Sequence, residues 1–493
     1  MSAAAVVAHA LVFPFPLQGH INSMLPFATA LVGSGVHVTF LHTDHNLRRL
    51  GVASATGVPP RSPSLRFVSV PDGLRDDDPR SVGALLALVE SLQVVASVAY
   101  RALLASLLSS STVSPCRGDH HDVGFPPVTC VVSDGYLPWA IDIADELGVP
   151  ALAFRTSSAC SVLAFLSVPR LLELGELPFP EGDDLDENVR GVSGMETFLR
   201  RRDLPSSFRR VGEHGVNPRL RVLVKDTFHS SKARALVLNT AASLERSSLS
   251  HIAPHMRDVF AVGPLNAMSP APSSASATTT SLWREDDRCM AWLDGQADRS
   301  VVYASLGSLA VITREQFTEL LSGLVSTGYP FLWVLRPDMV RASQHDVSQE
   351  VARATGDDGD KARVVAWAQQ RDVLRHRAVG CFLTHAGWNS TLEAAVEGVP
   401  MVCWPFFADQ QINSRFVGAV WKNGLDMKDV CDRAVVERMV REAMESAEIR
   451  RSAEDLARRV KRDVAAGGSS ATEFQRLIGF IRELSTSNVS LGQ

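Results

Sequence analysis

Short apolar runs alternate with helix-length stretches along most of the chain, and this alternation restricts the possible folds more than any other feature. Apolar runs that predict buried strands lie at 6–13, 36–42, 65–70, 128–134, 150–156 and 235–240, with helical patterns such as 81–109 and 137–147 between them. Parallel strands need a crossover of a dozen or more residues, usually a helix. The first half therefore predicts an α/β domain with a doubly wound parallel sheet.

The pattern stops at 267–281, a segment of Ser, Thr, Ala and Pro that cannot form a core, and then restarts. Further strands are expected at 300–307, 330–337, 362–368, 381–386 and 400–405, and helices at 313–326 and 389–397. The 493 residues exceed the roughly 250–300 at which a single core stops growing. We therefore expect domains at 1–266 and 282–470, a linker at 267–281, and a helix in 471–493 that docks on the first domain through Phe474, Leu477, Ile478 and Ile481.

Composition excludes several classes of function. A net charge of -5 gives no general basic field for nucleic acid, and the basic runs at 200–202 and 457–463 are expected to be solvated faces. The seven scattered cysteines indicate reduced thiols and a cytoplasmic location. No uninterrupted apolar run reaches the roughly 18 residues that indicate a membrane span. The acidic runs at 76–78 and 183–184 lack His at ligand spacing, so no metal site is expected.

The stretch CFLTHAGWNSTLEAAVEGVP, residues 381–400, places several polar side chains in one strand-to-helix turn. The free N–H groups and the dipole of a helix beginning near Asn389 would attract phosphate. His385, Asn389 and Ser390 could add donors, and Glu393 could accept from ribose hydroxyls. Alternatively, Ser390 and Glu393 form only a capping box, with Gly398 ending the helix. Capping explains neither His385 nor Trp388.

A second pair of residues predicts acid–base chemistry. His20 follows Gly19 at the expected start of the helix after the first strand, where the helix dipole disfavours the imidazolium. Asp134 ends the strand 128–134, and strand ends of a doubly wound sheet meet at one crevice. A carboxylate bonded to the far ring nitrogen would fix the tautomer of a general base. A lone His would otherwise be a structural side chain or an N-cap.

The stretch from Trp367 to Gln410, 44 residues long, resembles the nucleotide-sugar signature of plant family 1 UDP-glycosyltransferases. The resemblance extends to FPFPLQGHIN near the start, to 131–150, to 289–308 and to the GGSS at 467–470. It implies a GT-B fold, in which two Rossmann-like doubly wound parallel-sheet domains face a cleft, the first binding the acceptor and the second UDP-glucose. It also implies that His20 is the base and Asp134 its partner.

The same resemblance implies a role for each matching residue of the donor site. Trp367 would stack on uracil, the Ala368 backbone would read its edge, and Gln370 and Glu393 would hold the ribose. Donors to the diphosphate would be His385, Asn389, Ser390 and Ser308. Trp388, Asp409 and Gln410 would face the sugar, and a terminal Gln implies glucose rather than galactose. The sequence departs from the family at Gln369, usually Pro, which is expected to loosen the loop more than to alter a contact.

The reaction implied is direct displacement, in which glucose passes from UDP-glucose to a hydroxyl or carboxyl group of a flavonoid, phenolic, terpenoid or iridoid and becomes a β-glucoside. The acceptor would contact Phe15, Gly19, Tyr136 and Thr156. The stretches FPFPLQGHINSML, 13–25, and VTFLHTDHNLRRL, 38–50, resemble the subgroup that includes iridoid-acid and related glucosyltransferases. No cofactor beyond the donor is expected, and the protein would act as a monomer. One rival is a hydrolase built on His20, Asp134 and a serine, but the sequence has no Gly-x-Ser-x-Gly elbow at a strand–helix turn. The other is a non-catalytic UDP-sugar sensor, which would not need His20 and Asp134.

Overall fold

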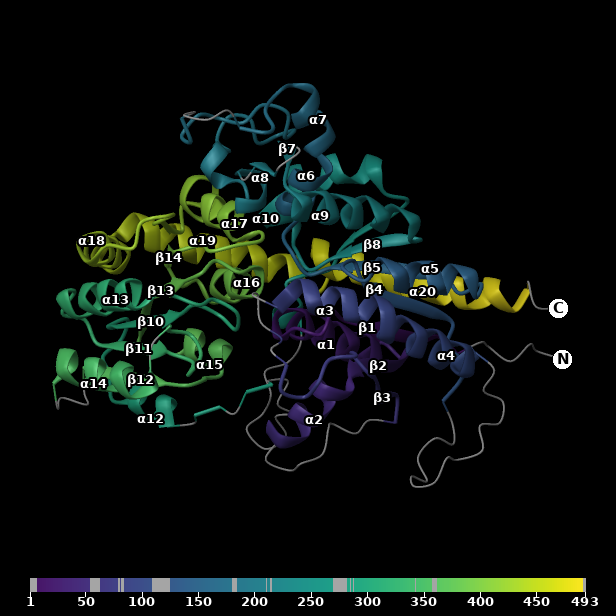
Figure 1. The fold of residues 1–493 in the computed structure, drawn as a ribbon, viewed down its shortest axis with the longest axis horizontal. Coiled ribbons are helices and arrows are strands. Elements are labelled where there is room, and N and C mark those ends of the chain that lie inside the picture. Colours follow the sequence, from purple (N-terminus) through teal and green to yellow (C-terminus); the bar gives the residue numbers. More distant parts are fainter. Residues whose placement is uncertain are drawn as a thin grey trace. The chain divides into compact units, whose positions relative to one another are not determined.

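The computed structural model describes residues 7–53, 63–78, 80, 84–108, 125–179, 184–209, 211–212, 215–268, 282–283, 285–286, 288–341, 343–356 and 361–490. The chain divides into two compact units. The first comprises Met1–Ala159, Val222–Leu282 and Asp463–Gln493, and the second comprises Cys160–Arg221 and Trp283–Arg462. Each unit is built on its own parallel sheet (Figure 1).

The sheet of the first unit has seven strands in the order β3-β2-β1-β4-β5-β8-β9, and every neighbouring pair is parallel. The central strands are almost wholly buried, as continuous apolar runs require when helices cover both faces of a sheet. The strand bounds are β1 His9–Phe13, β2 His37–Thr43, β3 Leu65–Val70, β4 Cys130–Asp134, β5 Ala151–Arg155, β8 Ala235–Leu238 and β9 Val259–Ala261.

The helices of this unit are the crossovers between its strands, followed by one helix from the end of the chain. They are α1 Gln18–Gly33, α2 Asp44–Ala53, α3 Leu85–Ser91, α4 Ser97–Leu108, α5 Pro138–Glu146, α9 Pro218–His229, α10 Ala242–Ile252, α11 Leu265–Met268 and α20 Ser469–Ser490, with a π-helical turn, η2 Leu92–Ala96, between α3 and α4. Phe474, Leu477, Ile478 and Ile481 of α20 are buried in the core shared with β1, β2 and β4.

The sheet of the second unit has six parallel strands in the order β12-β11-β10-β13-β14-β15. In Figure 1, α13 and α14 lie on one side of these strands and α15 and α16 on the other. The strand bounds are β10 Val301–Ser305, β11 Phe331–Val334, β12 Ala362–Val365, β13 Val379–Thr384, β14 Met401–Cys403 and β15 Gly424–Asp426. The helices are α12 Arg288–Asp294, α13 Arg314–Ser326, α14 Gln344–Thr355, α15 Gln370–Arg375, α16 Trp388–Glu397, α17 Gln410–Arg415, η6 Phe416–Trp421, α18 Arg433–Glu445 and α19 Ala447–Val464.

The expected α/β class with two doubly wound parallel sheets is confirmed. In both sheets the chain builds outward on one side of its first strand and then returns to the other side. The resulting switch points lie between β1 and β4 and between β10 and β13. Ligands of such sheets bind beyond the carboxyl ends of the strands at the switch point. These two edges are therefore where each unit should carry its chemistry.

Residues 160–221 belong to the second unit, so neither unit coincides with the expected range 1–266. The segment contains α6 Ala159–Leu166, α7 Val168–Glu173, η3 Arg201–Asp203, α8 Ser206–Arg209 and the short pair β6 Val211–Gly212 and β7 Gly215–Val216. The prediction that 200–202 is a solvated face was wrong, because Arg201 is buried and pairs with Glu176 and Glu187. The expected linker lies outside the described residues, except that 267 and 268 end α11.

One described helix, Leu85–Leu108, is long and apolar enough to cross a membrane by length and composition, with a mean hydropathy of 1.5 and 28% of its window buried. The sequence rule missed it because Glu90, Gln93 and Arg101 interrupt the apolar run. A single helix of this kind is weak evidence for a span, since core helices of other proteins meet the same test.

Leu477 offers a test of how much α20 stabilises the first unit. We expect Leu477→Ala to lower the free energy of unfolding by about 2–5 kcal/mol, because it leaves a cavity in the core beneath the sheet. Urea unfolding of the full chain measures the effect. Gln475→Ala, at an exposed position of the same helix, is the control. Equal unfolding midpoints for the two variants would show that α20 adds little to this core.

Candidate active site

A histidine and an aspartate meet at the switch point of the first sheet and form the candidate site of the first unit. His20 is the third residue of α1, the helix that follows β1, and Asp134 is the last residue of β4. Because β1 and β4 are neighbours, their carboxyl ends bring the two side chains together. The distance from His20 Nδ1 to Asp134 Oδ2 is 2.7 Å. The Asp134 side chain is fully buried, whereas that of His20 is 19% exposed.

Backbone donors fix the carboxylate of Asp134. Its Oδ2 also accepts from the Phe15 N–H at 3.2 Å, and its Oδ1 accepts from the Tyr136 N–H at 3.0 Å. Because a carboxylate can only accept hydrogen bonds, His20 Nδ1 carries the proton that it donates to Asp134. The lone pair of the neutral ring is then on Nε2, and His20 can accept a proton there.

Aromatic rings surround this histidine. The ring centroids of Phe15 and Tyr136 lie 5.3 and 5.6 Å from that of His20. Thr156, which follows β5, places its Oγ1 3.0 Å from His20 Nδ1 and so contacts the base directly. Gly19 precedes His20 in the first turn of α1, and its carbonyl accepts from Ser23. The four residues expected at the acceptor site therefore all lie next to the histidine, in chain or in space.

Arg155 is a buried residue of this region that sequence reasoning did not single out as a support of the site. Its guanidinium lies 4.2 Å from the centroid of the Tyr136 ring and donates to the Gly135 carbonyl and to Thr227 Oγ1 at 3.2 and 3.0 Å. A Cβ at Gly135 would lie 2.4 Å from Arg155 Cδ, so this turn requires glycine. Arg155 thereby supports the turn that donates to Asp134.

The second unit carries a candidate site of its own, the turn between β13 and α16. The N-cap of α16 is Gly387, without a side-chain cap, and Gly398 ends the helix in the left-handed region at φ 73°. The capping-box alternative is therefore wrong for Ser390 and Glu393, which lie inside the helix. Ala386, at φ 59°, has a conformation that few residues other than glycine adopt. The turn places the N-terminal end of α16, which includes Asn389, at the carboxyl edge of the sheet.

His385 lies between two glycines at the second switch point. A Cβ at Gly307, after β10, would lie 2.5 Å from His385 Nε2, and a Cβ at Gly387 would lie 2.4 Å from it. Burial, together with the charge of Arg336, lowers the pKa of His385 to about 4. Its Nδ1 is buried and has no hydrogen-bond partner among the described residues. The ring is thus neutral, and Ser308 lies in the adjoining turn after Gly307.

Gln370 holds Ser390 and Glu393 together. Its Nε2 donates to Ser390 Oγ at 2.8 Å and to Glu393 Oε2 at 2.7 Å. Burial raises the pKa of Glu393 to about 7, although the bond from Gln370 opposes the shift. The carboxyl group is therefore poised to change its charge near neutral pH.

Trp367 and Ala368 lie between β12 and α15. The Trp367 ring stacks with that of Trp283, with centroids 5.8 Å apart and planes 22° apart. Gln369, where the missing Pro was expected to loosen the loop more than to alter a contact, makes a side-chain contact of its own, because its Nε2 donates to Glu285 Oε2 at 2.6 Å. Its φ of -70° is one that Pro could adopt, so the side chain rather than the backbone distinguishes this position.

Asp409 and Gln410 begin helix α17 and are buried. Gln410 Oε1 accepts from the N–H groups of Phe406 and Phe407 at 2.8 and 3.1 Å. Because both partners are backbone donors, the amide orientation is determined, and only Nε2 can serve a further ligand. Trp388 is also buried, with its ring 6.4 Å from that of Trp421.

Arg336 is a residue of the donor site that the sequence did not reveal. It is 1% exposed and donates to the carbonyls of Gly307 and Ala310 at 2.5 and 3.0 Å, so a fixed positive charge supports the turn that carries Ser308. Within the described residues, no group of three His, Cys, Asp or Glu side chains could hold a metal ion.

Known proteins resemble this chain in both sequence and fold. Residues 274–449 match the family model described as UDP-glucoronosyl and UDP-glucosyl transferase. Myricetin 3-O-rhamnoside 1,2-glucosyltransferase of Crocosmia x crocosmiiflora is 44% identical over 97% of this chain and 96% of its own length. The 7-deoxyloganetic acid glucosyltransferase of Catharanthus roseus is 42% identical over 97% and 98%. The crystal structure of Os79 from O. sativa in complex with UDP has a TM-score of 0.75 at 27% identity, covering 97% of this chain and all of that one.

The chain therefore belongs to the plant family 1 UDP-glycosyltransferases, and it is a UDP-glucose-dependent glycosyltransferase of the GT-B fold.

The raised pKa of Glu393 predicts a dependence of stability on pH. A carboxyl group whose pKa is raised on folding contributes stability that is fully present below its unfolded value of 4.5 and is lost as pH rises through about 7. We expect Glu393→Gln to remove this loss, because the amide never ionises. Denaturant unfolding at pH 5.5 and 8.5 measures the difference. The exposed Glu442→Gln is the control, and a pH profile of Glu393→Gln that matches this control would contradict the shift.

Proposed function

We propose that the enzyme transfers glucose from UDP-glucose, with inversion, to a hydroxyl or carboxyl group of a small lipophilic plant metabolite and forms a β-glucoside. The observation that carries the proposal is the 2.7 Å bond between His20 and the buried Asp134. A donor-binding turn around His385 on the second sheet supports it.

In the proposed reaction His20 Nε2 removes the proton of the acceptor hydroxyl. The acceptor oxygen attacks the anomeric carbon of glucose, and the bond from that carbon to the β-phosphate oxygen breaks. The electron pair of this bond leaves with UDP. Asp134 stabilises the imidazolium that forms, because its ionised carboxylate accepts from Nδ1. One displacement converts the α-linked donor into a β-linked product.

The second unit supplies the groups that would hold the donor. Uracil would stack on Trp367 and bond to the Ala368 backbone, and the ribose hydroxyls would bond to Glu393 and Gln370. His385, Asn389, Ser390 and Ser308 would donate to the diphosphate, together with the N–H groups of α16. These donors oppose the charge that develops on the leaving group, so the proposal assigns that task to no metal ion and requires no cofactor. The sugar would contact the amide nitrogen of Gln410, the carboxylate of Asp409 and the region of Trp388.

The acceptor is proposed to be a flavonoid, phenolic, terpenoid or iridoid. The rings of Phe15 and Tyr136 beside His20 suit an apolar ligand with one reactive polar group. The relatives named for myricetin 3-O-rhamnoside and 7-deoxyloganetic acid support the flavonoid and iridoid classes. The alternative of a non-catalytic UDP-sugar sensor is not favoured, because a sensor needs neither the base nor its buried partner.

We also propose that the protein acts as a monomer in the cytoplasm. Each proposed binding and catalytic residue comes from the one chain. None of the six cysteines that the structure describes forms a disulfide, and five of them are buried, which suits a reducing compartment.

His20→Ala tests the base. With UDP-glucose and a neutral phenol we expect turnover to fall about 10²- to 10⁴-fold, the range that a positioned base supplies. A carboxylic acid acceptor is already ionised at neutral pH and should lose much less. UDP affinity, measured by calorimetry, should stay unchanged because no proposed nucleotide contact is removed. His251→Ala, on the surface of α10, is the control. Wild-type turnover of the phenol by the His20 variant would overturn the assignment.

Gln410→Glu tests the donor sugar. The new carboxylate can still accept from Phe406 and Phe407, but it offers an acceptor where the wild-type amide offers a donor. We expect kcat/KM for UDP-glucose to fall on the order of tenfold or more, and the preference for UDP-glucose over UDP-galactose to shrink. UDP affinity should not change. The exposed Gln349→Glu controls for the added charge, and unaltered donor preference in Gln410→Glu would argue against the sugar contact.

A further inference from the structure

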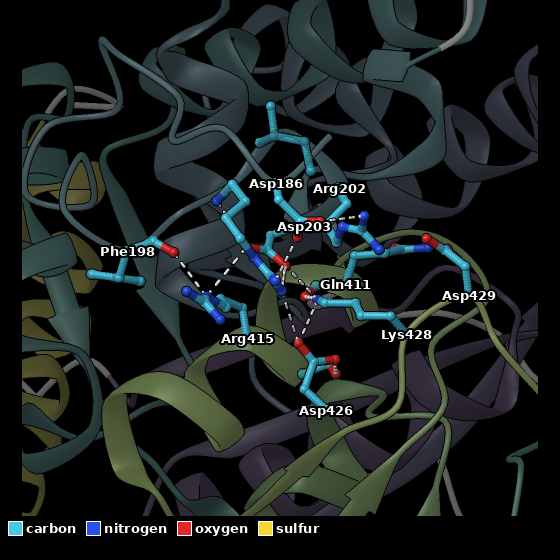
Figure 2. Close-up of polar contacts among 12 residues, drawn as sticks. Asp186, Phe198, Arg202, Asp203, Gln411, Arg415, Asp426, Lys428 and Asp429 are labelled. Carbon is cyan, nitrogen blue, oxygen red and sulfur yellow. Dashed lines mark hydrogen bonds and ion pairs between the residues drawn. The ribbon is translucent and has the colours of Figure 1, made fainter. Parts of the chain in front are cut away.

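A buried cluster of ion pairs in the second unit involves none of the residues assigned so far (Figure 2). Its centre is Asp203, the last residue of η3, whose side chain is fully buried. Lys428 Nζ lies 2.8 Å from Asp203 Oδ1, Arg415 Nε lies 3.3 Å from Oδ2, and Arg200 donates to both oxygens at 3.0 Å. One carboxylate is thus shared by three cations, of which Arg200 lies three residues before Asp203, and Arg415 and Lys428 lie more than 200 residues after it.

The charges of the cluster are well compensated. Burial alone would raise the pKa of Asp203, but the Lys428 ammonium and the Arg200 guanidinium outweigh it and hold the pKa below its usual value. Lys428 also contacts Asp426 at 3.2 Å. Buried ion pairs of this kind contribute little net stability compared with apolar packing, because removing the charges from water is costly. The main effect of the cluster is therefore to fix the positions of the segments that it joins, rather than to add to the free energy of unfolding.

That geometry is imposed on helix α17. Lys428 Nζ donates to the Gln411 carbonyl at 2.8 Å, and Asp426 accepts from Ser414 Oγ. Arg415, besides its pair with Asp203, donates to the Phe198 carbonyl at 2.8 Å. The cluster therefore holds α17 near its beginning and at its end, and the segment containing Phe198 and Asp203 takes part through side-chain and backbone atoms.

The opposite side of α17 is bound to the donor turn. The fully buried Asn413 donates through Nδ2 to the Ala386 carbonyl at 3.0 Å, next to His385. Gln410 begins the helix, and the preceding Ala408 has a φ of 57°, a conformation that a loop keeps only when its surroundings hold it. A shift of α17 would therefore move Gln410 relative to the turn that carries His385.

We propose that Asp203, acting through Lys428 and Arg415, is a positioning residue for donor-sugar selection, because it fixes the place of α17 and hence of the Gln410 amide. The inference rests on the donor-sugar role proposed above for Gln410. It adds a residue from the segment 160–221, outside the motif at 367–410, to the determinants of sugar specificity.

Asp203→Asn is the first test, because it removes the charge and keeps the size. We expect kcat/KM for UDP-glucose to fall about ten- to hundredfold, as for a group displaced by a fraction of an ångström to one ångström. The ratio of kcat/KM for UDP-glucose to that for UDP-galactose should also fall. The affinity for UDP, which lacks the glucose, should stay within about twofold. A general loss of structure would instead lower UDP affinity and kcat/KM together.

Lys428→Arg is the second variant and serves if Asp203→Asn does not fold. It keeps the charge, but a planar guanidinium cannot reproduce the three contacts of the ammonium. We expect the same fall in donor preference with unchanged UDP affinity. Glu319→Gln breaks the exposed pair with Arg433 on α13 and α18 and should leave both quantities as in the wild type.

Each result has one meaning. A reduced preference for glucose with unchanged UDP affinity supports the inference. An unchanged preference in both cluster variants, while Gln410→Glu alters it, overturns the inference and leaves the proposed donor site standing. If Gln410→Glu also leaves the preference unchanged, the role of Gln410 fails and the inference fails with it. A loss of UDP affinity equal to the loss of activity assigns the cluster a purely structural role and likewise overturns it.

Discussion

The hydrogen bond between His20 and Asp134 is the interaction on which the chemistry of this enzyme depends, and it exists only because of the order of strands in the first sheet. The two residues are 114 positions apart in the chain. They meet because β1 and β4 are neighbours at the switch point, where the order of the strands reverses. The backbone bonds from Phe15 and Tyr136 then fix the carboxylate, so the same turns that end the strands determine the histidine tautomer.

The second sheet repeats this topology for a different purpose. Its switch point brings Gly307 after β10 against His385 after β13, and both flanking glycines are needed because the imidazole occupies the space of a Cβ. Burial of His385, together with the fixed positive charge of Arg336 behind this turn, lowers the pKa of the imidazole and keeps it neutral. A neutral imidazole and a helix N-terminus beside a buried cation form a site suited to a diphosphate.

Much of this arrangement could be predicted from the sequence, because strand periodicity and the positions at strand ends are local signals. Both sheets were predicted in this way, and the structure places His20 and Asp134 together at the edge where strand ends were expected to meet. Residues whose role arises from tertiary contacts gave no such signal. Arg336 follows an ordinary apolar strand, and Asp203 ends a basic run that was expected to be solvated. At Gln369 the sequence showed only that the family's usual Pro is absent. It gave no sign of the bond to Glu285, which lies 84 residues away. The short strand β15 was missed because three residues carry too little periodicity.

The stereochemistry of the product tests the central claim most directly, since a single displacement assisted by His20 permits only one anomer. NMR of the glucoside product identifies the configuration at the anomeric carbon from the coupling of its anomeric proton. The account predicts the β-anomer alone from α-linked UDP-glucose, with both hydroxyl and carboxyl acceptors. An α-linked product would mean that the configuration is retained, which a single in-line displacement assisted by His20 cannot give, and it would contradict the account.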